Sequence, residues 1–137
     1  MEYNLEMRFL VVDDMEPMRL MITQQLRAMG FNHIKEAVDG EAAWGALERA
    51  AAEKKPIDFI ICDWHMPELK GIDLLKRCRA HLLYKNIAFV IVTSSAEMQY
   101  VTEAVEAGVD GYMVKPFSPA TFTSKFNFTY NKRFVKK

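Results

Sequence analysis

The chain has 137 residues, half of them hydrophobic, a length that suits one domain with a sizeable core. Lysine and arginine together number 18, as do aspartate and glutamate, so the formal net charge is zero. This balance gives no electrostatic reason to expect nucleic acid or an anionic membrane as a partner. No apolar run approaches the roughly 18 residues of a membrane span, and the acidic N-terminus lacks a signal peptide's apolar segment. We therefore expect a cytoplasmic protein.

Short apolar runs alternate with helical patterns along the chain. The runs are β-branched or aromatic and barely alternate in polarity, as strands buried on both faces do; a weaker second run is typical of an outer strand. In chain order, the predicted strands cover residues 9–12, 34–38, 57–62, 88–92 and 112–114, and a helix follows each of them. Five such units imply right-handed crossovers and a parallel sheet with helices on both faces.

Helices are predicted where apolar residues repeat with helical spacing between start and stop signals. Gly30 is expected to end the first helix, the second covers residues 40–54, and Ser118 is a plausible N-cap of the last, with Pro119 at its first position. The apolar residues expected on the buried faces are Met18, Met21, Ile22, Leu26 and Met29; Leu47 and Ala50; Ile72, Leu75, Cys78 and Leu82; Val101, Ala104 and Val105; and Phe122, Phe126 and Tyr130.

Polar side chains follow four of the predicted strands. The first run is followed by Asp13 and Asp14, the third by Asp63, the fourth by Thr93 and the fifth by Lys115. In a parallel sheet the carboxyl ends of the strands share one edge, where functional groups of such folds gather. We therefore expect these five side chains to converge.

Three carboxylates within a few ångströms repel one another, and a divalent cation relieves that repulsion. A site of carboxylate oxygens suits Mg²⁺. A carboxylate such as Asp63 can act as the nucleophile in phosphoryl transfer, with Lys115 and Mg²⁺ neutralising charge and the Thr93 hydroxyl donating to a phosphoryl oxygen. The set predicts a Mg²⁺-dependent phosphoryl acceptor.

Four motifs resemble the signature of response-regulator receiver domains. They are VVDD at residues 11–14, DWHMP at 63–67, TSS at 93–95 and GYMVKPF at 111–117. The resemblance extends from about residue 9 to about residue 130 and is greatest to the single-domain chemotaxis regulators. It implies a flavodoxin-like (βα)5 fold with strand order 2-1-3-4-5, and one receiver domain over residues 1–137 with a core of about 8–131.

The resemblance also assigns roles to site residues. Asp63 accepts a phosphoryl group from a phosphohistidine on a sensor histidine kinase. Asp14 binds Mg²⁺ directly, Asp13 mostly through water, and Asp63 and the backbone carbonyl of His65 are further ligands. Lys115 pairs with the phosphoryl group. No cofactor other than Mg²⁺ is expected, and the protein promotes its own phosphorylation and dephosphorylation without being an enzyme in the usual sense.

The switch itself is implied in the same way. A cis peptide bond between Lys115 and Pro116 aims the lysine, Thr93 moves toward the phosphoryl group, and Tyr112 swings inward. The surface formed by the fourth helix, fifth strand and fifth helix then changes its affinity for a protein target, such as a flagellar motor switch protein. We expect a monomer that contacts neither nucleic acid nor membrane, and Trp64 is expected to border the site.

Other functions stay open at this point. A phosphorelay carrier that passes the phosphoryl group to a histidine phosphotransfer domain would use the same site, and the chain can be a receiver excised from a longer regulator. A phosphatase with an aspartate nucleophile would want a second aspartate where His65 stands. A flavin carrier would want a Ser/Thr/Gly-rich loop after the first strand, where Asp13, Asp14 and Glu16 instead repel phosphate.

Overall fold

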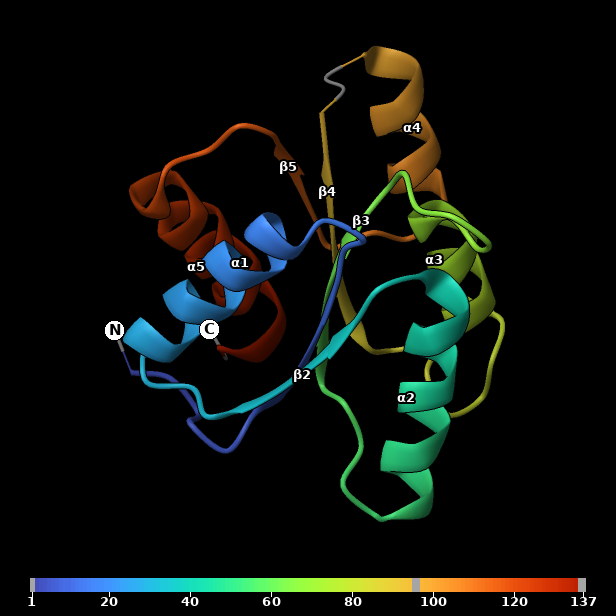
Figure 1. Cartoon of the computed structure of the whole chain (residues 1–137), viewed down its shortest axis with the longest axis horizontal. Coiled ribbons are helices and arrows are strands. Elements are labelled where there is room, and N and C mark those ends of the chain that lie inside the picture. The colour runs from blue at the N-terminus through green and yellow to red at the C-terminus, as the bar shows by residue number, and fades with distance from the viewer. Residues whose placement is uncertain (1, 95–96, 136–137) are drawn as a thin grey trace.

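The computed structural model describes residues 2–94 and 97–135 (Figure 1). Residues 1, 95–96 and 136–137 lie outside this description, and with them Ser95 of the TSS motif and the outermost ends of the predicted domain. Strands and helices alternate in the order β1 (Arg8–Val12), α1 (Glu16–Ala28), β2 (His33–Ala37), α2 (Gly40–Ala52), β3 (Phe59–Asp63), α3 (Gly71–Arg79), β4 (Ala88–Thr93), α4 (Met98–Glu106), β5 (Gly111–Val114) and α5 (Pro119–Phe134). Among the helices of the described residues, none has both the length and the apolar character to span a membrane.

The five strands form one parallel sheet in the order β2-β1-β3-β4-β5, which confirms the order implied by the resemblance. Helices α1 and α5 lie on one face, and α2, α3 and α4 cover the other (Figure 1). The strand bounds agree closely with the prediction, and the largest shift is at the start of β3, which begins at Phe59 and not at residue 57. Strands β1, β3 and β4 are central or next to the centre, so their carboxyl ends lie side by side.

Two apolar cores fill the spaces between the sheet and its helices. Under α1 and α5, the rings of Phe9, Phe31, Phe59 and Phe126 pack with centroids 4.7 to 5.9 Å apart. The other core joins buried strand residues to α2, α3 and α4, and includes Leu10, Ile60, Phe89, Leu47, Leu75 and Ala104. Because the inner strands β1, β3 and β4 are covered on both faces, they are almost entirely apolar, whereas the edge strand β2 carries exposed charged residues.

Side chains cap the starts of two helices, and the cap at Ser118 was predicted from the sequence. The Asp39 carboxylate accepts a hydrogen bond of 2.7 Å from the backbone N–H of Ala42 at the start of α2. The Ser118 hydroxyl accepts one of 3.1 Å from the backbone N–H of Thr121, and Pro119 is the first residue of α5. Each bond satisfies an N–H that has no partner within its helix.

Two residues predicted on buried helical faces are exposed. Helix α3 ends at Arg79, so Leu82 falls in the following loop with 85% of its surface exposed, and Tyr84 fills the buried position instead. On α4 only Ala104 is buried, and Val105 is 64% exposed. The prediction was wrong for Leu82 because the helix is shorter than its apolar pattern, and for Val105 because α4 contacts the core through a narrow stripe.

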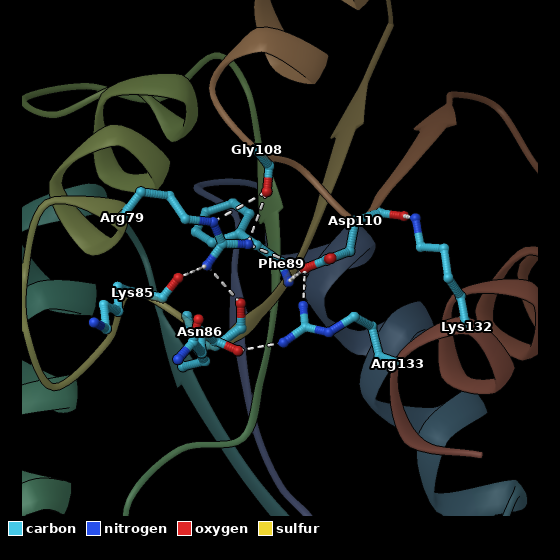
Figure 2. A network of polar contacts seen from close by, with 9 residues as sticks. Arg79, Lys85, Asn86, Phe89, Gly108, Asp110, Lys132 and Arg133 are labelled. Carbon is cyan, nitrogen blue, oxygen red and sulfur yellow. Dashed lines mark hydrogen bonds and ion pairs between the residues drawn. The ribbon is translucent and has the colours of Figure 1, made fainter. Parts of the chain in front are cut away.

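A polar network ties helix ends together at the edge of the sheet opposite the carboxyl ends (Figure 2). Asp110, before β5, accepts hydrogen bonds from the Arg79 guanidinium at 3.0 Å and from the backbone N–H of Phe89 at 2.9 Å, and it also pairs with Arg133 of α5. Arg79 further donates to the backbone carbonyls of Lys85, Ile87 and Gly108. One carboxylate thus links α3, β4 and α5.

Candidate functional site

The topology brings the predicted polar residues to one edge of the sheet. These residues are Asp13 and Asp14 after β1, Asp63 at the end of β3, Thr93 at the end of β4 and Lys115 after β5. Strands β1 and β3 are neighbours, as are β3 with β4 and β4 with β5. All four strands run in the same direction, so their following residues share a small region.

The carboxylates do converge. Asp13, Asp14 and Asp63 each offer an oxygen atom, and these atoms lie within 4.8 Å of one another. The Lys115 ammonium lies 3.1 Å from Oδ2 of Asp13 and 3.4 Å from Oδ1 of Asp63. Asp13 and Asp63 are buried, whereas Asp14 is exposed. The cluster therefore opens to solvent on the side of Asp14.

Backbone hydrogen bonds fix the loops that carry these side chains. The backbone N–H of Met15 donates to Oδ1 of Asp13 at 2.9 Å, which closes a tight turn after β1. The backbone N–H of Lys115 donates to the carbonyl of Thr93 at 2.7 Å and extends the ladder between β4 and β5. The peptide bond between Lys115 and Pro116 is cis, as the resemblance implies.

The loop after β3 folds back onto the acceptor. The backbone N–H of Gly71, the first residue of α3, donates to the carbonyl of Trp64 at 2.9 Å. A Cβ atom on Gly71 would lie 2.1 Å from the carbonyl oxygen of Asp63. Only glycine permits this approach, so Gly71 determines how closely the loop packs behind Asp63.

The electrostatics of Asp63 are unfavourable for its charged form. Burial raises the pKa of Asp63, and the negative charge of Asp13 raises it further. Lys115 opposes both effects, and the pKa of Asp63 still ends above its ordinary value. Two buried carboxylates with a single ammonium contact leave negative charge that a cation would compensate.

The residues fit Mg²⁺. This ion prefers carboxylate oxygens, keeps several waters and is bound by one to a few carboxylates. The three aspartates supply such oxygens from two neighbouring strand ends, and the exposure of Asp14 leaves room for water. The side chain of His65 is exposed, and its backbone carbonyl as a ligand stays a prediction.

Thr93 and Tyr112 connect the site to the edge strand β5. Thr93 is buried, and its side chain is hydrogen bonded to Tyr112 on β5. Burial raises the pKa of Tyr112, and this hydrogen bond opposes the shift. The tyrosine is half-buried and lines a groove beside α4 and α5.

Two features near the site were not predicted from the sequence. Trp64 is only 3% exposed and belongs to the core, where its ring meets Tyr100 edge-on with centroids 5.2 Å apart, and the expectation that it borders the site stays a prediction. Arg19 of α1 was not identified as a contact of the site, yet its guanidinium donates to the backbone carbonyl of Asp13 at 2.9 Å. An arginine in the first turn of the helix that follows an acidic pair is the only signal in the sequence, and it does not specify the contact.

Comparison with known proteins gives one consistent family. A family model described as "Response regulator receiver domain" matches residues 9–127. Chemotaxis protein CheY-3 of Vibrio cholerae is 40% identical over 129 residues, which cover 94% of this chain and 95% of that protein. Chemotaxis protein CheY of Pseudomonas aeruginosa is 37% identical over 126 residues, which cover 92% of this chain and 98% of that protein.

Solved structures agree. The chemotaxis response regulator CheY4 of Vibrio cholerae matches with a TM-score of 0.78 and 29% identity over 90% of this chain and 98% of that one. The CheX-CheY-BeF3-Mg complex from Borrelia burgdorferi matches with a TM-score of 0.79 and 27% identity over 95% of this chain and 90% of that one. In both, the shared fold extends over nearly the whole of each chain.

Proposed function

The chain belongs to the response regulator receiver family, and on that premise we propose that it is a two-component signalling switch that accepts a phosphoryl group on Asp63 with the help of Mg²⁺. The observation that carries the proposal is the convergence of three carboxylates within 4.8 Å, with the Lys115 ammonium 3.4 Å from Asp63. A purely structural role seldom requires buried carboxylates to crowd in this way.

Asp13, Asp14 and Asp63 would hold Mg²⁺, which when bound neutralises charge on the carboxylates and on phosphoryl oxygens. A carboxylate oxygen of Asp63 attacks the phosphorus of a phosphohistidine. The new P–O bond forms as the P–N bond breaks, and the electron pair of the P–N bond returns to the imidazole nitrogen of the donor. Lys115 pairs with the transferred group, and the Thr93 hydroxyl donates a hydrogen bond to it.

In this proposal, Tyr112 passes the change at the phosphorylation site to the surface that binds the target. A groove of about 350 Å³ lies between α4, β5 and α5, and its lining includes Val105, Tyr112, Lys125 and Phe128. Because Tyr112 is also hydrogen bonded to Thr93, a displacement of Thr93 toward a phosphoryl group reaches this groove through a single contact. Phosphorylation then shifts the population toward the conformation with the higher target affinity.

The relatives suggest the setting. Those with chemotaxis names are similar along nearly their whole length, so we propose a cytoplasmic, monomeric receiver over residues 1–137 that is phosphorylated by a sensor histidine kinase and acts on a flagellar motor switch protein. It is a phosphoacceptor that promotes its own phosphorylation and dephosphorylation and turns over no external substrate. The Borrelia burgdorferi relative was solved with BeF3 and Mg²⁺, which supports the same chemistry here.

Incubation with acetyl phosphate tests the acceptor chemistry. Intact mass spectrometry should find one added phosphoryl group with Mg²⁺ and none when EDTA removes the metal. The Asp63→Asn variant should stay unmodified, and Asp73→Asn, which changes an exposed carboxylate of α3, should be modified like the wild type. Equal modification with and without metal would refute the proposal.

A pull-down with beryllofluoride separates the switch from a phosphorelay carrier. The switch predicts tighter binding to a motor component when beryllofluoride and Mg²⁺ are present. Unchanged binding there, with rapid phosphoryl transfer to a histidine phosphotransfer domain, would assign the chain to a relay instead.

A further inference from the structure

Arg19 makes two directional contacts next to the acidic cluster. Its Nη1 donates to the backbone carbonyl of Asp13 at 2.9 Å, and its Nε donates to Oε1 of Glu36 at 3.1 Å. Arg19 lies on α1 and Glu36 on β2, so the guanidinium connects helix α1 with the turn after β1 and with the edge strand β2. The planar fork of arginine can bond both partners at once in fixed directions, which an ammonium cannot do.

The Asp13 carbonyl belongs to the peptide unit that leads directly into Asp14. The Asp13 carboxylate is itself held by the backbone N–H of Met15 and by Lys115. Within residues 2–94 and 97–135, by contrast, no hydrogen bond or ion pair holds the Asp14 carboxylate. Its position therefore depends on the orientation of the preceding peptide, and the Arg19 side chain donates a hydrogen bond to the carbonyl of that peptide.

The arginine of the Arg19–Glu36 pair is less exposed than the arginine of a surface pair. The Arg19 side chain is 13% exposed and Glu36 is 44% exposed, against 43% for Arg77 and 59% for Glu41 in their pair. Exposed pairs contribute little because water and salt screen them and because they must be ordered. The Arg19 guanidinium is largely shielded from solvent, so water screens its contacts less than those of an exposed arginine.

We infer that Arg19 is a positioning residue of the metal site, which holds the Asp13–Asp14 turn so that Asp14 presents its carboxylate to Mg²⁺; the inference rests on the proposed function. When Arg19 is replaced, a positioning role and a simple charge effect predict opposite changes in Mg²⁺ affinity. Loss of a positive charge beside three carboxylates would by itself strengthen cation binding. Loss of the group that orients a ligand weakens it, typically by about 10- to 100-fold for such outer contacts.

Calorimetric titration of the full chain with MgCl₂ measures this directly. Arg19→Met keeps most of the apolar stem and removes both donors, and we expect it to weaken Mg²⁺ affinity by roughly tenfold or more. Arg19→Lys keeps the charge but not the fork and should weaken affinity as well. The matched control is Arg77→Met, which removes an ion pair on the other side of the sheet and should bind Mg²⁺ like the wild type.

Amide hydrogen exchange without metal gives a second readout. The N–H of Met15 donates to Asp13 in the same turn, so it should exchange faster in Arg19→Met while amides of the central strands stay protected. Unchanged or tighter Mg²⁺ binding in both Arg19 variants would overturn the inference. If Arg19→Met does not fold, Arg19→Lys decides by the same criterion. A wild-type chain that takes up no Mg²⁺, or an Asp14→Ala variant that binds it equally well, would instead refute the proposed function.

Discussion

The ammonium nitrogen of Lys115 lies 3.4 Å from Oδ1 of Asp63, and yet the pKa of this aspartate is raised. Burial and the neighbouring charge of Asp13 outweigh the attraction of the lysine. The native fold thus holds Asp63 in a state in which ionisation costs free energy. A site that must bind a cation and a phosphoryl group keeps such strain, and other parts of the molecule compensate for it.

The pH dependence of stability without metal should report this cost. Because the folded pKa of Asp63 lies above its unfolded value, the folded state binds the proton more tightly, and the associated stability is lost as pH rises through the folded pKa. In EDTA at neutral pH, Asp63→Asn should therefore be more stable than the wild type in urea unfolding. The gain should shrink as pH falls through the folded pKa of Asp63, and should vanish below the ordinary aspartate pKa of about 4. Asp73→Asn should show no gain at neutral pH, and a pH-independent difference for Asp63→Asn would contradict the assignment.

Mg²⁺ itself should stabilise the folded chain. A ligand that binds only the native state at about 100 times its Kd adds roughly 2.7 kcal/mol to the free energy of unfolding. The wild-type melting temperature should rise accordingly with MgCl₂. Asp14→Ala should melt higher than the wild type in EDTA, because it relieves carboxylate repulsion, and should respond little to the metal. A variant that melts lower in EDTA would count against a repulsive cluster.

The close approach at Gly71 predicts a strong effect of one methyl group. In Gly71→Ala the new Cβ would meet the Asp63 carbonyl oxygen at 2.1 Å, so the loop must move, at a cost of about 2 kcal/mol or more. Gly45→Ala is the control, because its Cβ would meet only the flexible Arg49 side chain at 3.3 Å. Alanine in place of glycine within a helix should raise the free energy of unfolding by about 0.5–1 kcal/mol. Chemical denaturation compares the two, and equal effects would mean that the loop is not packed as described.

The Asp110 network predicts a stability effect far from the acidic cluster (Figure 2). Asp110→Ala leaves Arg79 and Arg133 partly buried without their carboxylate, and we expect a loss of roughly 3 kcal/mol. Glu103→Ala, which breaks an exposed pair with Lys76, should cost no more than about 1 kcal/mol. Denaturant unfolding of the two variants checks this, and losses of similar size would show that the network is no stronger than a surface pair.

The strands and the acidic site were predictable because both follow from local patterns and one general rule. Apolar runs mark the strands, and parallel topology brings the residues after them, such as Asp13, Asp63 and Lys115, to one edge. Leu82 was mispredicted because helical periodicity does not reveal that α3 ends at Arg79. The burial of Trp64 beneath Tyr100 and the contact of Arg19 with Asp13 depend on side chains that meet only after the whole fold is assembled.

Peptide mass spectrometry after treatment with acetyl phosphate and Mg²⁺ tests the central claim most directly, because it identifies which carboxylate becomes the acyl phosphate. We predict that the phosphoryl group is found on the peptide containing Asp63, and on no peptide containing Asp13 or Asp14. Modification at another residue, with the Asp63 peptide unmodified, would contradict the account.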